Sequence, residues 1–139
     1  MLPSAAMART GDDLEAYLTK LDQRFERLEN GTYLVAIAKG QPPLALRIAP
    51  PVVVLQVEIG GVPAGDAEAH ARLFRRLLEL NVQDLMHAAY GLDRDTITLT
   101  AALELDNLDL NELEAVFADM SLALAEHVPS LKRMAEQHT

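Results

Sequence analysis

The residues of this sequence that could do chemistry are four histidines, three serines and a run of carboxylates. The carboxylates gather in LELDNLDLNE, residues 103–112, which could be an acidic metal loop, a catalytic cluster or a junction between two structural elements. A calcium loop needs a glycine at its sixth position and a bidentate acid at its twelfth. Glu112 and Ala118 stand at those positions, so we expect no calcium site here.

The histidines and serines also lack the spacing of a known site. No two of the histidines lie one helical turn apart, as zinc ligands on a helix would, and there is no cysteine. His127 falls on the apolar stripe of a predicted helix, so we interpret it as a satisfied or rim histidine rather than a ligand. No serine lies in G-x-S-x-G, and GGVPAGD (60–66) has no lysine for a phosphate. We therefore predict no catalytic residue, metal or cofactor and interpret the protein as not an enzyme, although a carboxylate pair stays open as an alternative.

Composition and charge limit the partners and the location. Half of the residues are hydrophobic and 24% are charged, which is typical of a globular protein. The net charge of −9 argues against nucleic acid, because such a surface needs clustered Lys and Arg. The N-terminus MLPSAAMARTG lacks a signal-peptide pattern, and no segment approaches the ~20 apolar residues of a membrane span. We expect a cytoplasmic protein without membrane insertion.

The hydrophobic periodicity predicts the elements that would position any site. A period of two indicates strands and a period of 3.6 indicates helices. We expect an α+β fold in two layers, in the order α-β-β-β-α-β-β-α, with a mostly antiparallel sheet and helices on one face. Residues 1–11 are predicted to be a flexible tail and 12–139 a single domain. The expected elements are a helix at 12–29, strands at 32–39, 44–49 and 52–59, a helix at 67–80, strands at 84–90 and 96–105, and a last helix from Leu110 that Pro129 interrupts.

This order offers a structural reading of residues 103–112. Leu103 and Leu105 continue a strand with a period of two, whereas Leu110 and Leu113 begin a helical stripe. Asp109 stands where an N-cap is expected, and a helix start favours negative charge. We therefore interpret the acidic stretch as the junction between the last strand and the last helix.

Two sets of residues are candidates for binding a partner. Val52 and Val54 fall on the face of their strand that should meet water, so they indicate either a partial cover by a loop or a partner surface. Arg72, Arg75 and Arg76 form a basic ridge on the middle helix. That ridge is either a docking patch for an acidic partner or a solvated helix face with Arg–Glu pairs.

Three passages of the sequence resemble a known family. They are LFRRLLELN (73–81), AAYGLDRDTITLTAALELDNLDLNELEAVF (88–117) and HVPSLKRM (127–134). Together with the order of elements they resemble the type III secretion chaperone fold, that is, the Tir-chaperone (CesT-like) family and its YbjN-like relatives, over about residues 12–135. The resemblance implies a homodimer that holds an extended segment of a secreted client on apolar patches. YbjN-like members are described as regulatory or stress-related.

The functional hypothesis combines this resemblance with the missing chemistry. We expect a non-enzymatic protein-binding module, a dimeric secretion-chaperone-like adaptor that holds a polypeptide client. The alternative is a YbjN-like regulator of a stress or envelope response that acts through a protein partner. A small enzyme is the third hypothesis, and a deep polar pocket with buried carboxylates would favour it.

Overall fold

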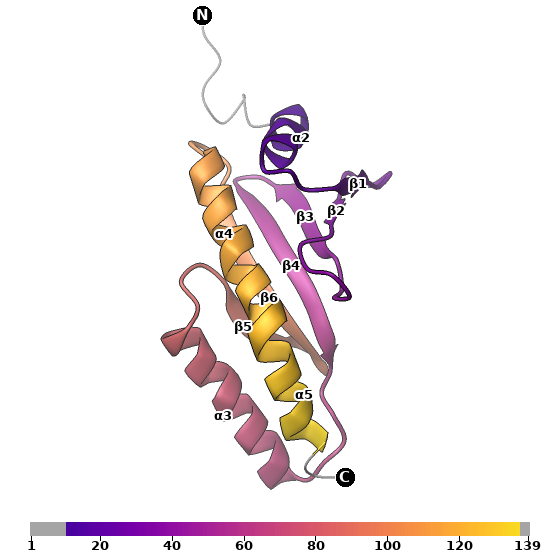
Figure 1. Cartoon of the computed structure of the whole chain (residues 1–139), viewed down its shortest axis with the longest axis vertical. Coiled ribbons are helices and arrows are strands. Elements are labelled where there is room, and N and C mark those ends of the chain that lie inside the picture. The colour runs from indigo at the N-terminus through magenta and orange to yellow at the C-terminus, as the bar shows by residue number, and fades with distance from the viewer. Residues whose placement is uncertain (1–10, 137–139) are drawn as a thin grey trace, which may run out of the picture.

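The computed structural model of the protein describes residues 11–136 (Figure 1). The predicted α+β fold and its order of elements are confirmed, with one short strand added before the predicted three. The helices are α2 (Gly11–Lys20), α3 (Ala67–Gln83), α4 (Leu110–Leu122) and α5 (Val128–Glu136), and a π-helical turn, η1 (Ala123–His127), joins the last two. The strands are β1 (Phe25–Arg27), β2 (Tyr33–Val35), β3 (Leu44–Ala49), β4 (Val52–Gly61), β5 (Ala89–Asp93) and β6 (Thr96–Glu104).

The strands form one antiparallel sheet with the order β1-β2-β3-β4-β6-β5. The long β4 and β6 pair in its middle, and the short β1 and β5 lie at its edges. Figure 1 shows the continuous rod of α4, η1 and α5 crossing in front of β4 and β6, with α3 beside it. The helices and the sheet thus form two layers. No helix within residues 11–136 combines the length and apolar character needed to span a bilayer.

The core lies between the inner face of the sheet and the helices. On β4, Val53, Leu55 and Val57 are fully buried, as alternation with a period of two requires. Leu55 pairs with Leu46 of β3 and with Ala101 of β6, so the buried rows run across neighbouring strands. The helices contribute their own buried leucines to the same core, such as those of α4 and η1. The buried face of β4 is therefore the one opposite Val52 and Val54, as the sequence predicted.

The strand-to-helix junction at residues 103–112 also has the predicted form. β6 ends at Glu104, α4 begins at Leu110, and Leu108 is buried in the turn between them. The Asp109 carboxylate accepts a hydrogen bond from the Glu112 amide at 2.8 Å and so caps the helix. Among residues 11–136, no group of three or more His, Asp or Glu side chains could hold a metal ion.

The predicted interruption near Pro129 takes the form of η1. In this turn the Val128 amide donates to the Ala123 carbonyl, five residues earlier. Proline lacks an amide donor, and its ring collides with the carbonyl four residues before it in an α-helix. The wider turn directly precedes Pro129, and the rod continues into α5.

The boundaries of several predicted elements were wrong. The first helix ends at Lys20 rather than at residue 29, because Asp22 adopts a left-handed φ of 58° and Phe25–Arg27 then pairs with β2. The strand predicted at 32–39 shortens to β2, and the strand predicted at 84–90 begins only at Ala89. Gly11 is the first residue of α2, and the rest of the predicted tail lies outside the described residues.

Candidate protein-binding surfaces

The outer face of the sheet, which points away from the helices, carries the two predicted valines. Here "outer face" denotes the side chains of β2, β3, β4 and β6 that alternate with the buried ones. The strand register places Val54 between Arg47 and Ala102, and Val52 between Ala49 and Glu104. Val52 and Val54 are both half-buried, because neighbouring strands flank them while the helices pack on the opposite face.

A hollow of about 560 Å³ opens on this outer face. Val54 lines it, whereas Val52 lies one row further along β4, outside it. Leu34 and Ala45 supply further apolar surface, and Arg47 and Glu58 bring one charge of each sign. The hollow is lined by Asn30, Thr32, Leu34, Pro42, Pro43, Ala45, Arg47, Val54, Gln56 and Glu58. Such a shallow, mixed surface suits an extended polypeptide better than a small molecule, which a deep pocket would enclose.

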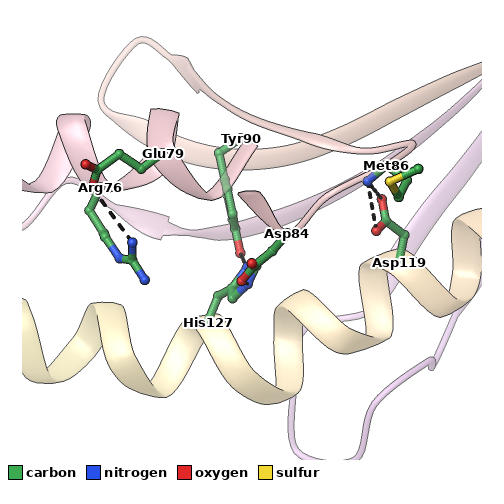
Figure 2. Close-up of polar contacts among 7 residues, drawn as sticks. All are labelled: Arg76, Glu79, Asp84, Met86, Tyr90, Asp119 and His127. Atoms are coloured by element: carbon green, nitrogen blue, oxygen red, sulfur yellow. Dashed lines mark hydrogen bonds and ion pairs between the residues drawn. The ribbon is translucent and has the colours of Figure 1, made fainter. Parts of the chain in front are cut away.

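The arginine ridge lies on a different surface from the valines. Arg72 forms an ion pair with Glu68 at 3.2 Å. Glu79 forms ion pairs with Arg75 at 3.7 Å and with Arg76 at 3.8 Å. Each arginine thus has a carboxylate partner within α3. Figure 2 shows the Arg76–Glu79 pair. Such exposed intrahelical pairs add only ~0.3–0.5 kcal/mol each. The geometry is that of a solvated helix face, and the docking role of these arginines stays a prediction.

A second apolar surface, which periodicity did not single out, lies where α3 meets the edge strand β5. We call it the α3–β5 patch and define it by Leu78, Val82, Met86 and Leu92. Val82 is 86% exposed, Met86 85% and Leu78 64%, which is unusual for large apolar side chains grouped together. Beside them is an apolar hollow of about 280 Å³ lined by Phe74, Leu77, Leu78, Tyr90, Gly91 and Leu92. The sequence does contain an indication of this patch, because Leu77, Leu78 and Val82 extend the apolar surface of the helix beyond a single face.

A chain of polar contacts runs from the exposed Asp84 to the buried His127 and Tyr90 and links three elements (Figure 2). His127 of η1, only 4% exposed, places Nε2 2.9 Å from the Asp84 carboxylate and Nδ1 2.8 Å from the Tyr90 hydroxyl. Burial, followed by the nearby carboxylates of Asp84 and Asp119, raises the pKa of Tyr90. Asn81 adds two contacts to the Tyr90 backbone, accepting from its amide at 2.7 Å and donating to its carbonyl at 3.2 Å.

The order carboxylate–imidazole–hydroxyl is also that of a catalytic general-base relay. The hydroxyl here is a phenol held neutral by its raised pKa, and it ends on a buried nitrogen. The Tyr90 ring lines the apolar hollow, but neither His127 nor Asp84 does. The three groups therefore tie η1 to the end of α3 and to β5 and do not converge on a polar pocket.

A buried carboxylate holds the segment between α3 and β5. Asp119 of α4 is 8% exposed and accepts hydrogen bonds from three successive amides. The amides of His87 and Ala88 each lie 2.8 Å from Oδ2, and that of Met86 lies 3.2 Å from both carboxylate oxygens. These bonds explain why β5 starts late, because the amides of residues 86–88 point at α4 instead of a neighbouring strand. They also place Met86 within the α3–β5 patch.

The comparisons with known proteins agree with the architecture. The CesT_Tir_1 family model matches residues 7–137. A chain of the heterodimeric ExoU–SpcU complex from the type III secretion system of Pseudomonas aeruginosa superposes with a TM-score of 0.65 at 18% identity, over 84% of this chain and 95% of that one. The Yersinia pestis type III secretion chaperone SycH, solved with a fragment of YscM2, gives 0.58 at 20% identity, over 88% and 99%. YbjN from E. coli gives 0.61 at 15% identity, over 93% and 94%. No curated protein sequence matches the chain.

Proposed function

Because the chain belongs to the CesT_Tir_1 family, we propose that it is a non-enzymatic, chaperone-like protein that holds an extended polypeptide segment on the outer face of its sheet. The observation that carries this proposal is the hollow of about 560 Å³ around Val54. An extended client can lay alternate side chains into such a surface without any catalytic group. His127, Asp84 and Tyr90 contact one another, but neither His127 nor Asp84 lines the neighbouring apolar hollow, which supports a binding role over an enzymatic one.

The α3–β5 patch serves, in this proposal, as the contact between two copies of the chain. Leu78, Val82 and Met86 are the most exposed large apolar side chains among the described residues. Burying them against an equivalent patch would remove apolar area on both copies, at about 25 cal/mol per Å². The outer face would then stay open on each subunit of the dimer for a client.

The client role can be tested by site-specific photocrosslinking in the native host. A photoreactive side chain at position 54 should capture a polypeptide, whereas the same group at Glu126, exposed on the helical layer, should not. Mass spectrometry of the captured chain identifies it. Capture from position 126 alone would contradict the proposed surface.

The identity of that captured chain also separates the two functional hypotheses. An exported polypeptide supports the chaperone-like adaptor. A single dedicated regulatory protein would instead favour the YbjN-like alternative, in which the same surface serves a stress or envelope response.

A further inference from the structure

The outer-face hollow has an arrangement of charges that bears on which client segments it accepts. Arg47 of β3 and Glu58 of β4 are exposed at opposite ends of the hollow. Neither forms an ion pair with any residue between 11 and 136. Arg47 lies directly across from Val54, and Glu58 is four residues beyond Val54 on the same strand. At about 3.4 Å per residue, the two charged rows are separated by roughly 14 Å along the strands.

The row between these charges holds two neighbouring apolar side chains, Leu34 and Ala45, with the polar Gln56 next to them. It contains Leu34, Ala45 and Gln56, which the register aligns across β2, β3 and β4. The alanine is the smallest side chain in this row, so the hollow has room for a side chain from a bound segment directly above it. From one end to the other, the surface therefore presents the cation Arg47, the apolar pair Leu34 and Ala45, and the anion Glu58.

An extended peptide has a matching repeat. Its side chains i, i+2 and i+4 point to the same side, and i and i+4 are about 13 Å apart. A segment with one acid and one base four residues apart would therefore place both over opposite charges and its middle side chain over Ala45.

We propose that the hollow selects client segments in which an acidic and a basic residue, four positions apart, flank a central apolar residue. The acid lies over Arg47 and the base over Glu58. This inference rests on the proposed function, because it assumes a polypeptide on the outer face, and it adds the chemical class of the segment. The overall charge of −9 would attract any basic chain, whereas this arrangement also requires an acid at a fixed spacing.

Fluorescence anisotropy with three labelled peptides tests the selection, with cores ETLTK, ETLTE and KTLTK. The wild-type protein should bind ETLTK about tenfold more tightly than the other two, since each of them turns one attraction into a repulsion. Arg47→Glu should then prefer KTLTK, and Glu58→Lys should prefer ETLTE. Because both directions of the peptide satisfy the same charges, this ranking does not depend on chain polarity.

A matched control is Glu104→Lys, which reverses an exposed charge on the same face but outside the hollow and should leave the ranking unchanged. Equal binding of all three peptides, weakened by Val54→Asp but not by the charge reversals, would overturn the selection while leaving the client surface intact. Failure of every peptide to bind would count against both. If Arg47→Glu instead changes the sedimentation coefficient, the face contacts a second copy of the chain, and the selection proposed here is wrong.

Discussion

Replacing Asp119 with alanine is expected to lower the free energy of unfolding by about 3 kcal/mol. The carboxylate is buried and accepts hydrogen bonds from the amides of Met86, His87 and Ala88. Through these bonds α4 holds the segment that joins α3 to β5. Alanine offers no acceptor, so all three amides lose their partner at once.

The magnitude follows from how exposed each amide would become. Hydrogen bonds to a charged group contribute about 1.5–3 kcal/mol each, and a buried donor left without an acceptor costs about 1–3 kcal/mol. Met86 and His87 lie at the surface, so water can replace much of what their amides lose. Ala88 is 6% exposed, and its amide would remain unsatisfied. A loss of about 3 kcal/mol is a large part of a typical stability of 5–15 kcal/mol but leaves the chain folded.

Urea unfolding followed by far-UV circular dichroism measures this loss. Glu114→Ala, an exposed acid in the same helix, is the control and should change stability by less than about 0.5 kcal/mol. Asp119→Asn keeps one acceptor oxygen and should fall between the two. The mutated segment carries Met86, so self-association should weaken as well. A loss below 1 kcal/mol for Asp119→Ala would refute the idea that this carboxylate holds the segment.

Three further predictions concern Tyr90 and the two surfaces. Because the pKa of Tyr90 is raised in the folded state, the contribution of Tyr90 to the free energy of unfolding is complete below the ordinary tyrosine pKa. This contribution declines as pH rises above about 10, by up to about 1.4 kcal/mol per pH unit. Tyr90→Phe should therefore flatten the alkaline dependence of stability on pH, measured by urea titration at a series of pH values. Val54→Asp should abolish peptide binding in fluorescence anisotropy. The midpoint of thermal unfolding of this variant should stay close to that of the wild type, because the new carboxylate faces Arg47. Unfolding of the monomer would show that this face was misassigned. Leu78→Asp should convert a dimer to a monomer in sedimentation velocity with a stability change within about 0.5 kcal/mol, as expected for an exposed site.

Hydrophobic periodicity predicted the central elements because each of them keeps a single period, two for a strand or 3.6 for a helix, over many residues. The alternation from Thr96 to Glu104 and the stripe that starts at Leu110 each depend on a single buried face, which sequence alone displays. The cap at Asp109 was also predicted, and its carboxylate bonds the amide three residues ahead. The resemblance to type III secretion chaperones and YbjN is confirmed, and it rested on these same passages.

The missed features depend on contacts between distant positions. Phe25 reads as the continuation of a helical stripe, but it lies in β1 and packs edge-on against Tyr33. Asn81 was predicted to follow the end of the middle helix, yet it lies inside α3 and bonds the Tyr90 backbone. Asp119 bonds amides more than thirty positions earlier. No local period encodes such pairings, so the late start of β5 was not predictable from spacing.

The π-helical turn has a consequence for how the chain tolerates insertions and deletions. Each residue turns an α-helix by about 100°, and a π turn contains one residue more than an α turn would need. Removing Ala125, which is exposed, would convert η1 to α-helix without deleting any core side chain. The rod would stay helical, and because the π turn already absorbs that residue, the residues after 125 would keep their faces and Leu131 would stay in the core. The π turn thus accommodates one extra residue, and one rod packs its first half on the sheet and its second half on α3.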